Sequence, residues 1–330
     1  MGFESLHPSH FPLFQELMIT KKNYFPFGYI LPAFLIVFAF RLIPIILSFI
    51  ISFFKWTIHG PEKFIGFQNY IKLFQDPVFW QSLLNTFYLV VFVVPITLIL
   101  SLFFANLLNR TKKLSGLFRT TYFVPTVTSL VAISIVWKLI FSPHGGLMNH
   151  VLGFFSIHGL NWLSEPQGIF TLLFGAMGIN IPNALGGPSL ALFAIIIVSI
   201  WRSLGYNTII YLAGLQNIPE VYYEAAEIDG ASKWKQFLNI TVPLISPTTF
   251  YVLLMTTITT FQVFSQVYLM TGPPIGGPLG TTKVIVYYIF ETGFGESQNL
   301  SYASAIALVL FFIILGLTML QKRLEKKVQY

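Results

Sequence analysis

The chemistry-bearing side chains of this 330-residue sequence gather in one short stretch, and they are acidic. Four of its twelve Asp and Glu residues fall within ten positions: Glu220, Glu224, Glu227 and Asp229. On a helix the three glutamates share one side, beside an apolar stripe. Such a cluster could act as a ligand set, lie as a solvated helix on a membrane, or dock a partner. Because anionic lipid favours basic surface helices, this acidic one favours docking to a soluble protein.

Local signals predict where this acidic helix begins and ends. Asn217 is a suitable N-cap, Pro219 suits the first turn, and Gly230 can adopt the left-handed conformation that ends a helix. We therefore expect a short helix over about residues 218–229.

Other reactive constellations are missing from the sequence. There is no cysteine, and the six histidines are never paired with carboxylates at metal-ligand spacing. No Gly-x-x-x-x-Gly-Lys-[Ser/Thr] loop occurs, so the chain lacks this nucleotide-binding motif. The sequence predicts no catalytic residue, no metal site and no enzymatic activity.

The composition is that of a polytopic membrane protein. Hydrophobic residues make up 55% of the chain and charged residues only 9%, with a mean hydropathy of +0.73. That leaves too little polar surface for a soluble fold. The formal charge of +7 comes from nineteen dispersed basic residues, which form no dense nucleic-acid patch.

Six stretches are long and apolar enough to cross a membrane as helices, which need about 20 residues each. They are about 28–54, 82–108, 119–141, 189–214, 246–270 and 300–321. The remaining ends are a tail over 1–27 and a basic tail over 322–330. Twelve Lys and Arg residues flank the spans on the side of both termini and four on the other side. The sequence thus predicts an all-α, six-span protein with both termini in the cytoplasm.

A long connection over 142–188 is expected on the outer face. It contains an apolar piece over 168–179 that is too short to span and is bounded by prolines. We interpret this piece as an interfacial or re-entrant segment, because a seventh span would reverse the orientation of everything after it.

Ionisable and polar groups within spans are costly and are therefore functional candidates. Arg202 lies near the middle of the fourth span, beside Trp201 and close to Gly205 and Asn207. It suits either a hydroxylated or anionic solute or a structural bond to backbone carbonyls near Gly205.

A second polar group is expected on the fifth span. Gln262 and Gln266 are one turn apart on the predicted helix, with Ser265 beside them. This stripe suits either a solute pathway or hydrogen bonding between helices.

The acidic segment resembles a known family motif. Glu224-Ala225-Ala226-x-x-Asp229-Gly230-Ala231 is similar to the EAA loop of binding-protein-dependent ABC importer permeases. Further blocks resemble the carbohydrate-uptake branch of that family. They are Phe118-Arg119-Thr120, Trp137-Lys138, Asn161-Trp162-Leu163, Ser199–Tyr206, Tyr211–Pro219 and Tyr302–Ala305.

This resemblance implies the type I ABC importer permease fold over 28–321, with residues 217–245 as the coupling loop. Glu224 would pair with a basic group of a separate ATPase subunit, Gly230 would permit the turn, and the alanines Ala225, Ala226 and Ala231 would allow close packing. The implied partners are a homologous second permease, two ATPase subunits that bind the ATP and Mg, an extracytoplasmic solute-binding protein and membrane lipid. The implied location is the bacterial plasma (inner) membrane, and the solute is a sugar or related polyol.

Two other classes compete with this interpretation. An ion-coupled secondary transporter would normally carry carboxylates within its spans, yet no Asp or Glu lies in any of the six. A membrane-embedded enzyme would need an acidic or metal cluster near one interface. The only such cluster has the Ala-Ala-x-x-Asp-Gly-Ala context of a docking helix.

Overall fold

The computed structural model describes residues 25–57, 60–110, 124–157, 159–182, 185–272 and 274–328. The chain divides into two compact units, Met1–Ile50 and Ile51–Tyr330, which we describe separately. The described part of the first unit is helical: α2 covers Phe25–Val37, the π-helix η2 covers Phe38–Leu42, and α3 begins at Ile43 and ends at Ile51. Its side chains after Tyr29 are apolar apart from Arg41 and Ser48, which suits a membrane-spanning helix.

Two wide π-turns in this chain lie directly before prolines. In η2 the Ile43 amide bonds Phe38 O, and Pro44 follows. In η4, Phe237–Thr241, the Val242 amide bonds Phe237 O, and Pro243 follows. A proline cannot donate to the carbonyl four residues earlier and its ring crowds that carbonyl, so a widened turn relieves both problems.

A small hairpin follows the first helix and was not expected from the sequence. Strand β1, Phe54–Thr57, pairs antiparallel with β2, Gly60–Phe64, and α4 covers Gln68–Gln75. The helix therefore ends at Ile51, three residues before the predicted end of the first span. The Trp56 amide donates to Ser301 Oγ at 2.7 Å, which ties the hairpin to the start of the last helix.

Three long helices form the framework of the second unit: α5, Pro77–Arg110; α10, Leu190–Gln216; and α17, Leu300–Val328. Helix α10 begins at a Ser189 cap, whose side chain accepts from the Leu192 amide at 3.0 Å. Side chains from α5 and α10, including Leu89, Val93 and Ile195, are almost fully buried in one core cluster. Burial of these apolar faces fixes the helices against each other.

The fifth predicted span is not one helix. Helices α12, Lys233–Gln236, and α13, Val242–Leu244, flank η4 and meet α14, Ser246–Phe261, at a bend of 65°. Helix α14 then stops, and α15, Ser265–Met270, starts only after an irregular turn. The prediction of a continuous helix over 246–270 was wrong because periodicity alone does not reveal a break without Pro or Gly.

Shorter helices occupy the connections. They are α7, Leu130–Ile140; α8, Leu147–Phe154; α9, Ile169–Ala176; the 3₁₀ turn η5, Pro278–Gly280; and α16, Ile285–Phe294. Helix α9 forms the apolar piece expected over 168–179. Within the described residues, four helices are long and apolar enough to span a membrane, or five with the bent pair. The third predicted span begins in residues outside those described.

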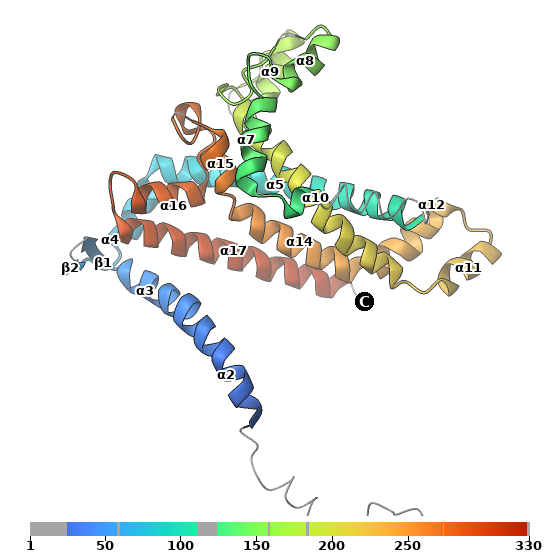
Figure 1. The fold of residues 1–330 in the computed structure, drawn as a ribbon, viewed down its shortest axis with the longest axis horizontal. Coiled ribbons are helices and arrows are strands. Elements are labelled where there is room, and N and C mark those ends of the chain that lie inside the picture. The colour runs from blue at the N-terminus through green and yellow to red at the C-terminus, as the bar shows by residue number, and fades with distance from the viewer. Residues whose placement is uncertain are drawn as a thin grey trace, which may run out of the picture. The chain divides into compact units, whose positions relative to one another are not determined.

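The connections lie at distinct ends of the second unit. Helices α11 and α12 lie at one end, whereas the hairpin, α4 and α16 lie at the other (Figure 1). The sequence assigns these two groups of elements to opposite sides of the membrane.

Candidate functional site

The acidic segment forms a helix that projects into solvent. Helix α11 covers Val221–Ile228, and none of its residues is buried. Ile228 is 87% exposed and Val221 61% exposed, so apolar as well as acidic side chains are uncovered. Such a surface is available to a second protein.

The start of α11 differs from the prediction. Asn217 is the C-cap of α10, and its amide bonds Gly214 O and Leu215 O. Pro219 follows two residues later, as is common after a helix end. The N-cap of α11 is Glu220, whose side chain makes no capping bond. The signals at 217–219 therefore belong to the end of the preceding helix.

The end of α11 is built as predicted around Gly230. This residue has a φ of +72°, and a Cβ placed on it would meet nothing within 4 Å. The Gly230 amide bonds Glu227 O at 3.0 Å and the Ala231 amide bonds Ala226 O at 2.8 Å. These two bonds form a Schellman motif, so glycine is needed here for its backbone conformation and not for space.

The carboxylates of the segment have different surroundings. Glu227 forms an ion pair with Lys233, whose hydrogen bond and charge lower the pKa of the glutamate below its ordinary value. Glu224 and Asp229 are exposed, and within the described chain no side chain pairs with the Glu224 carboxylate. Of the small residues, Ala225 is exposed and Ala226 half-buried. Glu224 is therefore available to a basic group of another protein.

Behind α11 lies a cavity of about 300 Å³. Tyr223 of α11 lines it, together with Thr241 of η4 and the α5 residues Asn106 and Asn109. The Tyr223 hydroxyl and Thr241 Oγ1 share a hydrogen bond of 2.9 Å. Gln236 Nε2 donates to Ala231 O at 3.2 Å, which fixes the turn after α11 to α12.

Arg202 and Asn207 are brought together at a polar cavity of about 180 Å³. The Arg202 Nε atom is buried there without a hydrogen-bond partner. Asn207 is buried and donates through Nδ2 to Thr256 Oγ1 at 3.1 Å. An orphaned guanidinium donor facing a cavity can bond an oxygen-rich molecule that enters it.

The three residues of the fifth span do not join this cavity. Gln262 is the exposed C-cap of α14, whereas Ser265 is the first residue of α15 and Gln266 is buried. The helix breaks between them, so the predicted stripe of two glutamines one turn apart was wrong. The Arg202 cavity is lined instead by residues that sequence reasoning missed, namely Thr126, Ser203, Tyr206, Met255, Thr256 and Thr259. A run of threonines in the apolar fifth span was the available signal.

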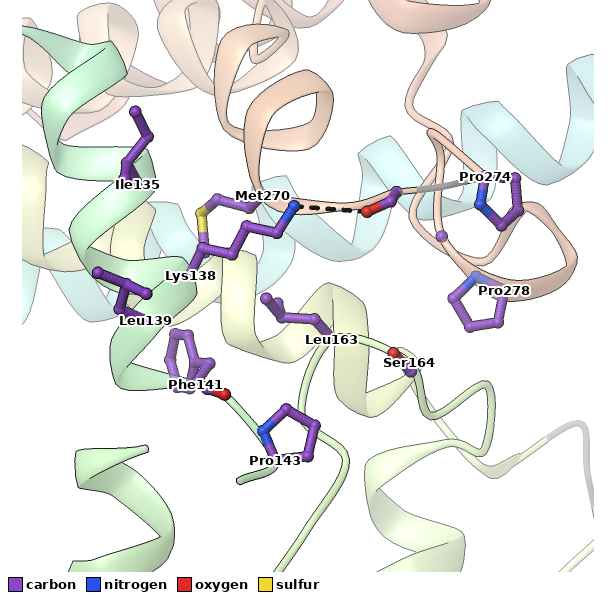
Figure 2. Close-up of a pocket in the computed structure, with 13 residues that line it drawn as sticks. Ile135, Lys138, Leu139, Phe141, Pro143, Leu163, Ser164, Met270, Pro274 and Pro278 are labelled. Atoms are coloured by element: carbon purple, nitrogen blue, oxygen red, sulfur yellow. Dashed lines mark hydrogen bonds between the residues drawn. The ribbon is translucent and has the colours of Figure 1, made fainter. Parts of the chain in front are cut away.

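A third cavity of about 410 Å³ lies between α7, the following loop and the segment after α15. Figure 2 shows Lys138 extending across it, with Nζ donating to Gly272 O at 3.4 Å. Pro143, Leu163 and Pro274 line its walls. Lys138 is the only charged side chain among the described residues that line this cavity.

A polar cluster near the start of α5 was also not predicted from the sequence. Asp76 Oδ2 accepts hydrogen bonds from the hydroxyls of Tyr288 and Tyr302, the latter at 2.7 Å, and Oδ1 accepts from the Val78 amide. Partial burial, the largest single effect, raises the pKa of Asp76, but the tyrosine and amide bonds together hold it below its ordinary value. Burial and the bond to Asp76 raise the pKa of Tyr288. The cluster joins α16 and α17 to the start of α5.

No metal site accompanies these features. Among the described residues, no group of three or more His, Cys, Asp and Glu side chains is placed to hold a metal ion. Residues of the membrane-spanning α10 and of α14 line a polar cavity, and an exposed acidic helix with a fixed end follows α10. These features are typical of a membrane-embedded transport subunit.

Comparisons with known proteins identify the family. Residues 78–330 match the family described as binding-protein-dependent transport system inner membrane component, and the chain belongs to it. It is therefore a multi-pass inner membrane component. Membership supports the ABC importer permease interpretation, not the ion-coupled alternative, and the family consists of transport components and not enzymes.

Individual relatives match over most of their length. The probable ABC transporter permease protein YurN of Bacillus subtilis (strain 168) is 34% identical over 94% of this chain and 98% of its own. The lactose transport system permease protein LacF of Rhizobium radiobacter is 37% identical over 89% of this chain and 91% of its own. A crystal structure of a bacterial alginate ABC transporter, in complex with an alginate pentasaccharide-bound periplasmic protein, matches with a TM-score of 0.76. At 21% identity, over 96% of this chain and 98% of that one, it supports the fold alone.

Proposed function

We propose that this permease forms half of a translocation path and pairs with a homologous second permease. Two ATPase subunits would bind ATP and Mg, and an extracytoplasmic solute-binding protein would deliver the solute. The family description, which names a binding-protein-dependent system, supports the solute-binding protein as a partner. The chain itself carries no P-loop, so nucleotide chemistry belongs to other subunits.

The coupling element is the loop over 217–245, with α11 as its docking helix. The observation that carries this proposal is an uncovered helix that presents Glu224 and apolar side chains and ends at a fixed turn. Glu224 pairs with a basic group of the ATPase subunit. Ala225 and Ala226 allow its surface to approach closely, and Asp229, Gly230 and Ala231 hold the turn. Movement of the ATPase subunits then shifts the membrane helices between two arrangements.

Charge reversal and backbone restriction test this role. Glu224→Lys places like charges together, and Gly230→Pro cannot adopt a φ of +72° and loses the amide bond to Glu227 O. Both variants should insert into the membrane normally but lose uptake and loosen control of ATP hydrolysis. Glu296→Lys, an exposed glutamate two residues after the end of α16, is the control. Normal uptake in both α11 variants would refute the coupling role.

The solute path is assigned to the cavity at Arg202 and Asn207. The orphaned Nε atom and the surrounding hydroxyls suit a ligand with many oxygens. Gln262, Ser265 and Gln266 do not line this cavity, and their place in the solute path stays a prediction. Arg202→Ala should impair transport while the complex still assembles, and failed assembly would instead identify a structural role for Arg202.

The solute class is a sugar or related polyol. The names of the lactose relative and of other relatives for arabinooligosaccharides, sn-glycerol-3-phosphate and trehalose/maltose support this assignment. A panel of radiolabelled mono-, di- and oligosaccharides, glucosylated polyols and glycerol phosphates should include one that stimulates ATP hydrolysis by the reconstituted complex. The outer connection over 142–188, which contributes to the cavity in Figure 2, is the proposed docking surface for the binding protein.

A further inference from the structure

Among the described residues, Tyr223 makes a half-buried polar contact from the coupling helix to the base of the fifth membrane helix. Within the described chain, the side chains of α11 are exposed except those of Tyr223 and Ala226, which are half-buried. Tyr223 reaches across the 300 Å³ cavity and shares a hydrogen bond of 2.9 Å with Thr241 Oγ1. Within the described residues, most of the α11 surface is exposed, so few contacts join this helix to the segment behind it.

Thr241 is firmly part of the membrane bundle. It is only 4% exposed and is the last residue of η4. Its carbonyl accepts from the Ile245 amide at 2.9 Å. Ile245 is buried in a core cluster with Leu108 of α5 and Tyr211 of α10. A force applied to the Thr241 side chain is thus applied at the 65° bend before α14.

The other contacts of α11 are less suited to transmit a displacement of this helix to the membrane helices. The Glu227–Lys233 ion pair joins side chains that are 55% and 66% exposed, and exposed pairs contribute little. It also reaches only α12. Gln236 of α12 donates to Ala231 O in the turn after α11 and also bonds the exposed Glu227 side chain, so it too connects α11 to α12 and not directly to η4.

Resting on the coupling role proposed above, we propose that Tyr223 is a positioning residue that links α11 to the base of the fifth membrane helix. Its hydroxyl holds Thr241, so that α11 and α14 move as one body when the ATPase subunits close. Without this bond α11 can follow the ATPase while η4 and α14 stay behind. ATP hydrolysis then continues with less rearrangement of the membrane helices.

Spin-label distances test the link directly. The chain has no cysteine, so Glu220→Cys and Tyr251→Cys place one label before α11 and one on α14. The labelled chain is assembled with its partner subunits in liposomes and measured with and without Mg and ATP. With Tyr223 present, we expect one narrow distance in both conditions. In Tyr223→Phe, loss of one hydrogen bond should raise the population of a second distance about fivefold.

Matched variants separate the link from general damage. Thr241→Val should behave like Tyr223→Phe, and the double variant should be no worse, because both remove the same bond. Thr241→Ser keeps a hydroxyl and should therefore show the same single distance between the two labels as the wild type. Tyr222→Phe, on the same helix but exposed, is the control. An unchanged distance in both Tyr223→Phe and Thr241→Val would overturn the proposal.

Failure of this link can be told apart from failure of the coupling role. If Glu224→Lys abolishes uptake while Tyr223→Phe leaves the label distance intact, α11 still couples but not through Thr241. If Glu224→Lys leaves uptake intact, the coupling role itself is wrong, and the proposed role of the Tyr223–Thr241 bond is wrong as well.

Discussion

Gly230 offers a direct test of whether the conformation of the turn after α11 matters. Its φ of +72° costs an L-residue about 1–2 kcal/mol, and a Cβ there would touch nothing within 4 Å. The whole penalty of Gly230→Ala is therefore conformational. About 1.4 kcal/mol corresponds to a tenfold change in an equilibrium constant. We expect the ratio of the formed turn to its open forms to fall about tenfold in Gly230→Ala.

The assay is uptake per ATP hydrolysed by the reconstituted complex, with hydrogen exchange of the α11 amides measured in parallel. Helix α11 has only eight residues and depends on its end motif, so the Gly230 and Ala231 amides should exchange faster. Gly230→Asn should lose less than Gly230→Ala, because asparagine tolerates this conformation. Gly316→Ala, in α17 at an ordinary φ with equally open space, is the control. Equal behaviour of the Ala, Asn and wild-type proteins would refute the reasoning.

Three further predictions follow from the other sites. Arg202→Lys should retain more transport than Arg202→Ala but less than wild type, because lysine keeps the charge and lacks the planar fork of donors; equal rates in a transport assay would contradict this. Asp76 has a pKa below its ordinary value of 3.8, so its ionised form stabilises the fold at pH values above 3.8. This contribution is lost as the pH falls through the lowered pKa of the folded state. Thermal unfolding at pH 7 and at pH 3 should therefore differ more for wild type than for Asp76→Asn, and parallel losses would argue against the cluster. Lys138→Met should lower the unfolding free energy by less than about 1 kcal/mol, because it removes only one long bond to Gly272 O; a larger loss in a denaturant titration would show that Lys138 is a structural anchor.

Some features of the candidate site were readable from local sequence. The left-handed glycine at 230, the acidic side chains before it and the small alanines act within one or two helical turns. The start of the helix was misread, since Asn217 and Pro219 serve equally well as signals for the end of the preceding helix. Nothing local distinguishes those two uses of the same residues.

Interactions between distant residues could not be predicted in the same way. Thr256 lies 49 residues from Asn207 yet bonds it, and Tyr302 lies 226 residues from Asp76 yet bonds it. These contacts depend on which helix faces pack together. From the sequence, the threonines of α14 are recognisable only as polar residues in an apolar span, and their partners on other helices are not.

The sequence by itself determined that the chain enters a membrane, because runs of apolar residues have no stable place in water, and that its acidic helix ends before Gly230. Only the tertiary structure decided where the fifth membrane helix bends and breaks and which hydroxyls surround Arg202. It also decided that Tyr223 reaches Thr241. Apolar content and helix ends are set by neighbouring residues, whereas bends, cavities and long-range hydrogen bonds arise only when separate helices pack against one another.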